Sequence, residues 1–114
     1  MHELSLTQSL LDIIEDYAGK HHFEKVNSLK LSFGRLSCIE PKSLEFAFEV
    51  LSENTRAQGA RLEFDILPAV LYCASCEKEV TVNGYQDECP LCGGQDVILA
   101  GGTQELKLLE LDVD

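Results

Sequence analysis

Two cysteine pairs constrain the fold of this chain more than any other feature. The sequence places Cys73-Ala-Ser-Cys76 and Cys89-Pro-Leu-Cys92 on either side of residues 77–88. A gap of two residues lets both thiolates of a pair reach one ion from a tight turn, and two such turns complete a tetrahedral sulfur shell that favours zinc. Such a shell has no open position, so the zinc would be structural. We therefore predict a zinc ribbon with Cys73, Cys76, Cys89 and Cys92 as ligands.

The residues around these pairs favour the same module. Gly93 and Gly94 follow the second pair and permit the positive φ that a metal knuckle needs. Asn83-Gly84 lies in the middle of the intervening arm and is a strong hairpin signal. The expected module is therefore two knuckles on a short β-hairpin. Reactive dithiols are the alternative, but thioredoxin-like chemistry uses one pair at the start of a helix that follows a strand.

The remainder of the chain predicts an α+β domain. Apolar periodicity predicts two helices, and alternation predicts three strands. In the last strand the apolar phase changes between Leu108 and Leu109, which predicts either a bulge there or a strand that is covered on both sides. The order predicts two helices on one face of a three-stranded sheet, with the zinc ribbon inserted before the last strand. The helices are expected at 4–17 and from 41 to near 54, and the strands at 28–33, 61–66 and 105–113. The domains are then a discontinuous α/β domain of residues 1–69 and 98–114 and a zinc-ribbon domain of residues 70–97.

Composition narrows the class of protein. The 114 residues include 20 acidic and nine basic side chains, for a formal charge of −11. Such a field repels phosphate backbones and argues against nonspecific nucleic-acid binding. No apolar run approaches the roughly 18 residues that a membrane span needs. The start of the chain is acidic and has no apolar stretch behind it, so we expect a cytoplasmic protein without a secretory signal.

No catalytic motif is recognisable, so we expect a protein that is not an enzyme. The start His2-Glu3-Leu-Ser-Leu lacks the second histidine of the His-Glu-x-x-His metalloproteases, and there is no Gly-x-Ser-x-Gly. Cys38 stands outside the pairs and is expected to be a small buried apolar side chain. His21 and His22 are expected in a solvated turn after the first helix.

His2 has one unusual property, which is its distance from the chain terminus. Before a large residue such as histidine the initiator Met1 is normally retained, so its α-amine stays beside the imidazole. The amine, the His2 amide nitrogen and a His2 ring nitrogen can then chelate one ion. A further nitrogen, such as the Glu3 amide, gives the square-planar set that Ni(II) and Cu(II) favour. From these residues alone, an ordinary terminal histidine remains the alternative.

Taken together, these segments resemble the HypA/HybF family, the nickel metallochaperones that mature [NiFe]-hydrogenases and, in some bacteria, urease. The resemblance begins at Met1-His2-Glu3-Leu4 and continues through "FGRLSCIEPKSLEFAFEVL" and "TRAQGARLEF". It includes the "CPLCGG" of the second cysteine pair and ends in "GGTQELKLLELDVD". It therefore covers essentially the whole chain.

The resemblance implies a function and a set of site residues. His2 would be the essential nickel ligand, supported by the neighbouring nitrogens of Met1 and Glu3, and the four paired cysteines would hold a structural zinc. The partners would be the GTPase HypB and the hydrogenase large-subunit precursor, with urease accessory proteins in some bacteria, and neither nucleic acid nor membrane. The expected function is to bind Ni(II) at the N-terminus and deliver it during hydrogenase maturation.

Two other functions remain open from the residues themselves. A nucleic-acid-binding ribbon is one, although between Cys73 and Cys92 the only basic residue is Lys78, against four acidic residues. A zinc-ribbon adaptor without a nickel function is the other.

Overall fold

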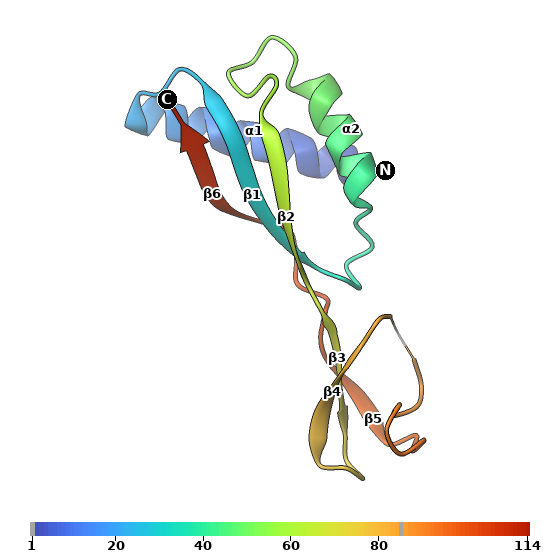
Figure 1. The fold of residues 1–114 in the computed structure, drawn as a ribbon. Helices are drawn as coiled ribbons and strands as arrows, with labels where there is room; N and C mark the ends of the chain where they lie inside the picture. The colour runs from blue at the N-terminus through green and yellow to red at the C-terminus, as the bar shows by residue number, and fades with distance from the viewer. Residues whose placement is uncertain (1, 85) are drawn as a thin grey trace.

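The computed structural model describes residues 2–84 and 86–114, which form an elongated molecule with one sheet toward each end (Figure 1). Its extents are 54 × 26 × 17 Å, and its radius of gyration is 17.8 Å, whereas a single compact domain of this length would have about 13 Å. The elements are α1 (His2–His21), β1 (Val26–Gly34), α2 (Pro41–Leu51), β2 (Arg61–Leu67), β3 (Ala69–Cys73), β4 (Lys78–Val82), β5 (Val97–Gly101) and β6 (Lys107–Val113).

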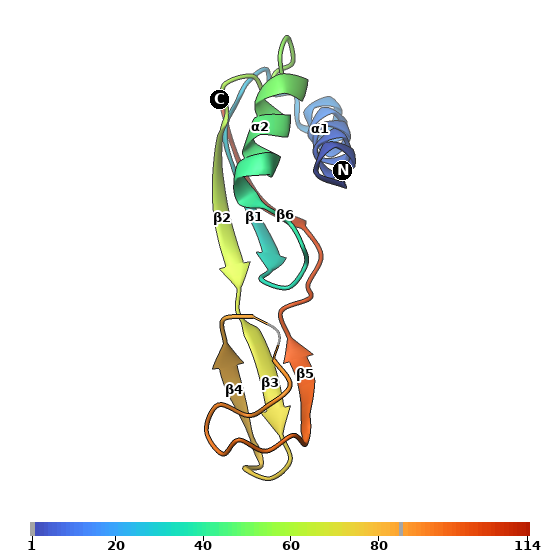
Figure 2. The same ribbon diagram turned by 90° about the vertical axis from the view of Figure 1, so that its right-hand side faces the viewer.

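The first sheet has the strand order β2-β1-β6, and both helices cover one of its faces (Figure 2). Strand β1 pairs in parallel with β2 through the α2 crossover, and it pairs in antiparallel fashion with β6. Lys30 lies opposite Glu110 and Leu31 opposite Leu108, so Leu109 is the extra residue of a bulge. The predicted α+β class, the three-stranded sheet with helices on one face and the bulge are therefore confirmed.

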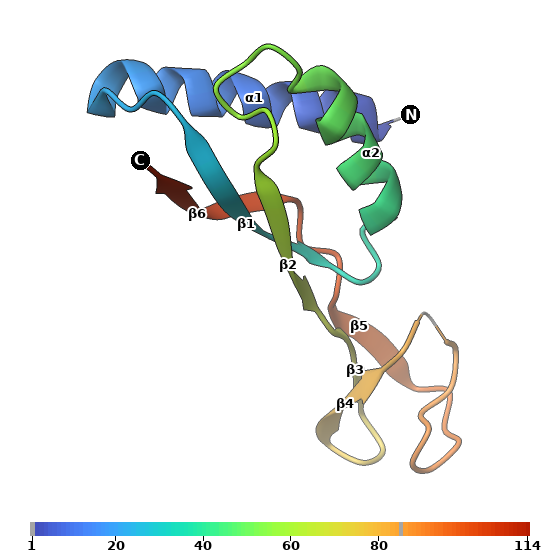
Figure 3. The same ribbon diagram turned by 45° about the horizontal axis from the view of Figure 1, so that its top comes forward.

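The main hydrophobic core lies between this sheet and the two helices, a unit that we call the helical body (residues 2–67 and 107–113). Alternate residues of the central strand β1 point into the core, and their exposed fractions are 0% for Leu29 and Leu31 and 2% for Phe33. The helices contribute Ile14 and Leu44, which are equally buried. Helix α2 connects the parallel strands β1 and β2, and a helix in such a crossover covers the sheet. It closes one half of this core, and α1 closes the other half (Figure 3).

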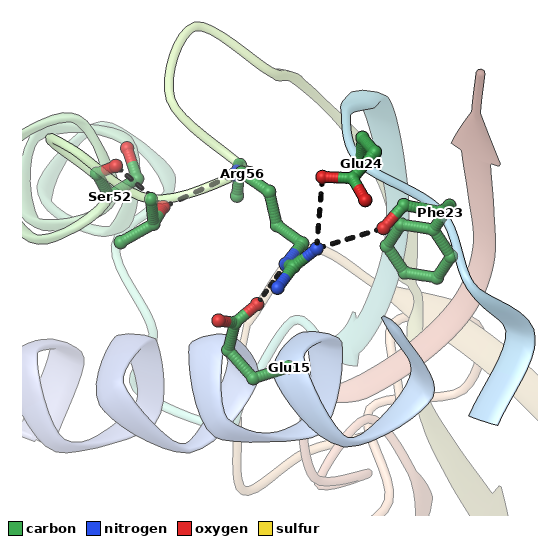
Figure 4. A network of polar contacts seen from close by, with 7 residues as sticks. Glu15, Phe23, Glu24, Ser52 and Arg56 are labelled. Carbon is green, nitrogen blue, oxygen red and sulfur yellow. Dashed lines mark hydrogen bonds and ion pairs between the residues drawn. The ribbon is translucent and has the colours of Figure 1, made fainter. Parts of the chain in front are cut away.

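Polar contacts around Arg56 tie the loop after α2 to α1 and to the start of β1 (Figure 4). The guanidinium donates from Nε to the Glu15 carboxylate at 2.6 Å and from Nη1 to the Phe23 carbonyl at 2.9 Å. The Arg56 carbonyl in turn accepts from the Val26 amide at 2.9 Å. One residue therefore joins three segments that are far apart in the sequence.

Helix α1 is longer than its apolar periodicity predicted, since it begins at His2 and ends at His21. His22 then adopts a left-handed backbone with φ of 56°, and its amide donates to the Ala18 carbonyl at 2.8 Å. This is the conformation of a helix C-cap, for which glycine is the usual residue. The helix passes through Gly19 because one glycine lowers helix stability by only about 1 kcal/mol.

The second sheet, with order β4-β3-β5, forms the unit that we call the cysteine ribbon (residues 69–101). Its hairpin differs from the expected one. Strand β4 pairs with β3, so the turn of the hairpin is the first cysteine pair, and β5 pairs with the other edge of β3. Asn83-Gly84 only follows β4. Long-range pairing of β5 with β3 overrides the local turn signal here, and the division into residues 1–69 with 98–114 and 70–97 stays a prediction.

The two units meet at a tight backbone junction. The Arg35 amide donates to the Leu67 carbonyl at 2.8 Å, and the Leu36 amide donates to the Gly102 carbonyl at 2.6 Å. A Cβ atom added to Gly34 would collide with the Gly102 carbonyl, and one added to Gly102 would lie 2.7 Å from the Ala69 Cα. Both glycines are therefore required for the close approach of the two connections.

In the described part of the chain, neither helix combines the length and apolar character that crossing a membrane requires.

Candidate metal centre

The structure brings the four paired cysteines together at the far end of the cysteine ribbon. Cys73 ends β3, Cys76 lies in the turn before β4, and Cys89 and Cys92 come from the loop between β4 and β5. Their four sulfur atoms all lie within 4.8 Å of one another. Among the described side chains, these four form the group that could hold a metal ion. Cys73 and Cys89 are buried, whereas Cys92 is exposed.

The geometry of these sulfurs fits zinc. Four zinc–sulfur bonds of about 2.3 Å in a tetrahedron place the sulfurs about 3.8 Å apart. The Cys73 and Cys92 sulfurs lie 3.6 Å apart, and the Cys76 and Cys89 sulfurs 3.9 Å apart. A disulfide would need about 2.05 Å, so these thiols are free. Because each pair supplies two ligands, the arrangement is a closed sulfur shell of the structural type.

Backbone N–H groups donate to a sulfur atom in each cysteine pair, at the first cysteine of one pair and at the second cysteine of the other. The Cys76 amide donates to the Cys73 sulfur at 3.4 Å, and the Gly94 amide donates to the Cys92 sulfur at 3.4 Å. Such N–H donors orient thiolate ligands and reduce their negative charge. The second knuckle is closed further by the Gly93 amide, which donates to the Cys89 carbonyl at 2.8 Å. The ribbon therefore holds the sulfurs in place through its own main chain.

The residue after each pair takes a left-handed backbone conformation. Gly93 has a φ of 72°, and Glu77 in the equivalent place has a φ of 55°. The prediction that both Gly93 and Gly94 serve a positive φ is therefore correct for Gly93 only. At Gly94 the constraint is space, because an added Cβ would lie 3.2 Å from the Cys92 sulfur. Glu77 was missed, although its place directly after a Cys-x-x-Cys pair was a usable signal.

Close packing of the thiols separates their pKa values. Backbone hydrogen bonds from Cys92 and then Leu91 lower the pKa of Cys89 to about 7. Hydrogen bonding with the Cys92 side chain, followed by burial, raises the pKa of Cys76 to about 12. A metal ion binds thiolates, so it must displace the proton of Cys76, whereas Cys89 is already charged at mildly alkaline pH.

The start of α1 lies beside the start of α2. A Glu3 carboxylate oxygen lies 3.5 Å from the amide nitrogen of Glu40, which is the N-cap of α2. The Glu40 side chain itself accepts from the Lys42 amide at 3.0 Å. Of the predicted nickel residues, Glu3 is thus placed next to the loop before α2, whereas Met1 and the side chain of His2 lie outside the described part of the structure. Apart from the place of Glu40 before Pro41, nothing in the sequence indicated that Glu40 lies close to Glu3.

The remaining cysteine and the histidine pair do not join the metal centre. Cys38 was expected to be buried, and this is wrong: its side chain is exposed, and its backbone has a φ of 67°. The turn between β1 and α2 requires that left-handed conformation and directs the side chain outward. His21 and His22 are exposed as predicted, but His21 is the last residue of α1 and only His22 follows the helix.

Comparison with known proteins gives matches over essentially the whole chain. The family model described as "Hydrogenase/urease nickel incorporation, metallochaperone, hypA" matches residues 1–113. The hydrogenase maturation factor HypA of Syntrophus aciditrophicus is 57% identical over 114 residues, which is 100% of both chains. That of Albidiferax ferrireducens is 41% identical over the same 114 residues, again 100% of both chains.

Solved structures agree with this fold. The solution structure of the nickel metallochaperone HypA from Helicobacter pylori aligns with a TM-score of 0.63 at 25% identity, covering 99% of this chain and 97% of that one. A second solution structure of a HypA protein aligns with a TM-score of 0.68 at 27% identity, covering 99% and 96%.

Proposed function

Because this chain belongs to the HypA family of hydrogenase/urease nickel-incorporation metallochaperones, we propose that it binds Ni(II) at its N-terminus and delivers it during the maturation of [NiFe]-hydrogenase or urease. The ligands are His2, the Met1 amine and the backbone nitrogen of Glu3. The partners in delivery are the GTPase HypB and the hydrogenase large-subunit precursor, or urease accessory proteins. The chain acts in the cytoplasm as a carrier rather than an enzyme.

The observation that carries this proposal is the completeness of the four-sulfur site. Four cysteines already fill a tetrahedral shell, so a transferable ion needs other ligands. Nickel(II) favours nitrogen donors in a square-planar set, which a free amine, amide nitrogens and an imidazole provide. The cysteine ribbon then keeps its zinc permanently, and the N-terminus takes nickel reversibly.

A nickel titration of the protein with its native N-terminus tests the proposal. The parent should bind nickel, and His2→Ala should lose this affinity while its zinc content stays unchanged. His21→Ala is the matched control, because this histidine is exposed at the other end of the same helix, and it should bind like the parent. A His2→Ala variant that kept its nickel affinity would disprove the site and favour the zinc-ribbon adaptor.

The zinc assignment has its own matched pair of variants. Cys92→Ser removes one of the four sulfurs and should lower the zinc content of the purified protein. Cys38→Ser removes an exposed thiol outside the cluster and should leave the zinc content at one ion per chain. Metal analysis of the two proteins, purified side by side, measures the difference, and equal loss in both variants would contradict the assignment.

A further inference from the structure

A groove with an apolar floor and an acidic rim runs between α2 and residues 58–62. Its volume is about 730 Å³. The floor is formed by side chains that are buried or half-buried, namely Phe48, Ser52, Ala60 and Leu62. We call this feature the α2 groove.

Large apolar side chains are exposed to solvent along the lip of the α2 groove. Phe46 is 68% exposed and Val50 is 49% exposed, and the two residues lie one helical turn apart. Large apolar side chains at this spacing form a continuous ridge along a helix. Exposed apolar surface that is bordered by charges is a common mark of a protein-binding site.

Acidic side chains line the same groove. Glu45 and Glu49 are also one turn apart on α2, and Glu53 follows just beyond the end of the helix. Arg61 on the opposite rim is an exposed basic group, and it makes an ion pair with Glu63 at 3.5 Å. The α2 groove therefore presents a row of carboxylates beside a row of apolar side chains.

We propose that the α2 groove binds a basic amphipathic helix of a partner protein. A helix of this kind places its apolar residues at one-turn spacing against the floor and the Phe46–Val50 ridge, and its lysines or arginines against the row of carboxylates. The groove extends along residues 45–53, which is about 12 Å at 1.5 Å per residue and accommodates about two helical turns.

Charge selects this partner over a second copy of the chain. The protein carries a formal charge of −11, so two copies repel one another, whereas a basic segment is attracted from a distance. The acidic rim would also face unpaired carboxylates in a self-complementary contact through this helix face. The occupant that fits is therefore basic and comes from another protein.

The groove also lies next to the N-terminal end of α1. Phe46 lines a second hollow of about 460 Å³ together with Glu3, Leu4 and Lys42. A partner seated in the α2 groove is thus adjacent to the segment that carries the proposed nickel ligands. The idea that this docking serves the nickel site rests on the proposed function. The docking itself does not.

The test measures binding of a synthetic helical peptide of about five turns, with leucines along one face and lysines along the other, by fluorescence anisotropy. The parent protein should bind it. Phe46→Asp should weaken binding by about tenfold because it removes the apolar ridge. The triple variant Glu45→Gln, Glu49→Gln, Glu53→Gln should weaken binding to a similar extent and reduce its dependence on salt.

Matched variants separate this site from general attraction to an acidic protein. Ile98→Asp changes an apolar side chain of nearly equal exposure, 66%, on the cysteine ribbon and should bind like the parent. Glu105→Gln, Glu110→Gln, Asp112→Asn removes three exposed carboxylates that do not line the α2 groove, and it should also bind like the parent. A peptide of the same composition with its leucines scattered around the helix should bind at least about tenfold more weakly.

Several results would overturn the proposal. These are no binding by the parent, equal binding by Phe46→Asp, equal weakening by either control variant, or equal binding of the scattered peptide. A parent dimer that Phe46→Asp dissociates in sedimentation velocity would assign the groove to a second copy. If the parent itself binds no nickel, the proposed function fails, and the peptide results still decide the groove.

Discussion

At the scale of single residues, the metal centre depends on backbone conformations as much as on sulfur atoms. The residue after each cysteine pair has a positive φ, but the chain uses glycine in one knuckle and Glu77 in the other. A left-handed conformation costs a residue with a Cβ atom roughly 1–2 kcal/mol. The two knuckles are therefore alike in shape but unequal in strain.

Substitutions at these two positions should act in opposite directions. Gly93→Ala should destabilise the zinc-bound protein by about 1–2 kcal/mol, because alanine must adopt a φ of 72°. Glu77→Gly should stabilise it by about 0.5 kcal/mol, since relief of strain exceeds the extra entropy of glycine in the unfolded chain. Chemical denaturation at fixed zinc concentration measures both. Gly84→Ala, with open space around the added Cβ, is the control, and a Gly93→Ala protein as stable as this control would refute the strain.

At the scale of elements, Arg56 holds the helical body together where regular structure does not. It bonds α1 through Glu15 and the segment before β1 through the Phe23 carbonyl. Arg56→Met keeps much of the packing volume but leaves this carbonyl without its donor, so it should destabilise the protein by about 1–3 kcal/mol. Arg61→Met is the matched control, because its pair with Glu63 is largely exposed and contributes at most about 1 kcal/mol. Equal unfolding midpoints in urea for the two variants would show that the Arg56 contacts are not stabilising.

The individual elements also show which parts of the structure could be predicted from the sequence. The helices, the three strands of the first sheet and the bulge at Leu109 follow from local periodicity, because each has one face on a large core. Strands β3 and β5 were not predicted, because Ala69–Cys73 and Val97–Gly101 are short apolar runs without the alternation that indicates a half-buried strand. The hairpin at Asn83-Gly84 was misplaced because β4 pairs with β3 across the first cysteine pair, and no strand pairs with β4 across Asn83-Gly84 in the described part of the chain.

The part of the candidate site that could be predicted from the sequence is the set of paired cysteines, because their spacing itself indicates metal ligands. The four cysteines lie close enough together to hold one metal ion, as their two-residue gaps predicted. The exposed position of Cys38 depends on a left-handed turn that no residue preference indicates, so its burial was wrongly predicted. The contact between Glu3 and the Glu40 amide joins residues that are distant in the sequence, and only the packing of α1 beside α2 brings them together.

At the scale of the whole molecule, the two units differ in what stabilises them. The helical body has a core of buried leucine, isoleucine and phenylalanine side chains, whereas the cysteine ribbon has two small clusters around Leu71 and Val80. Clusters of this size bury too little apolar surface to fold a module alone. We therefore expect the ribbon to depend on the proposed zinc for its stability, whereas the body to which the junction at Gly34 and Gly102 attaches it should not.

Removal of zinc should consequently unfold one end of the molecule and leave the other intact. A structural zinc contributes on the order of 10 kcal/mol, which is comparable to the whole stability of a small domain. After treatment with a strong chelator, amides of residues 69–101 should lose protection in hydrogen exchange, whereas amides of β1 and the buried face of α1 should keep it. Helical circular dichroism should change little, because both helices belong to the helical body. Readdition of zinc should restore protection in the ribbon. Loss of protection throughout the chain would instead mean that the junction couples the two units into one cooperative fold.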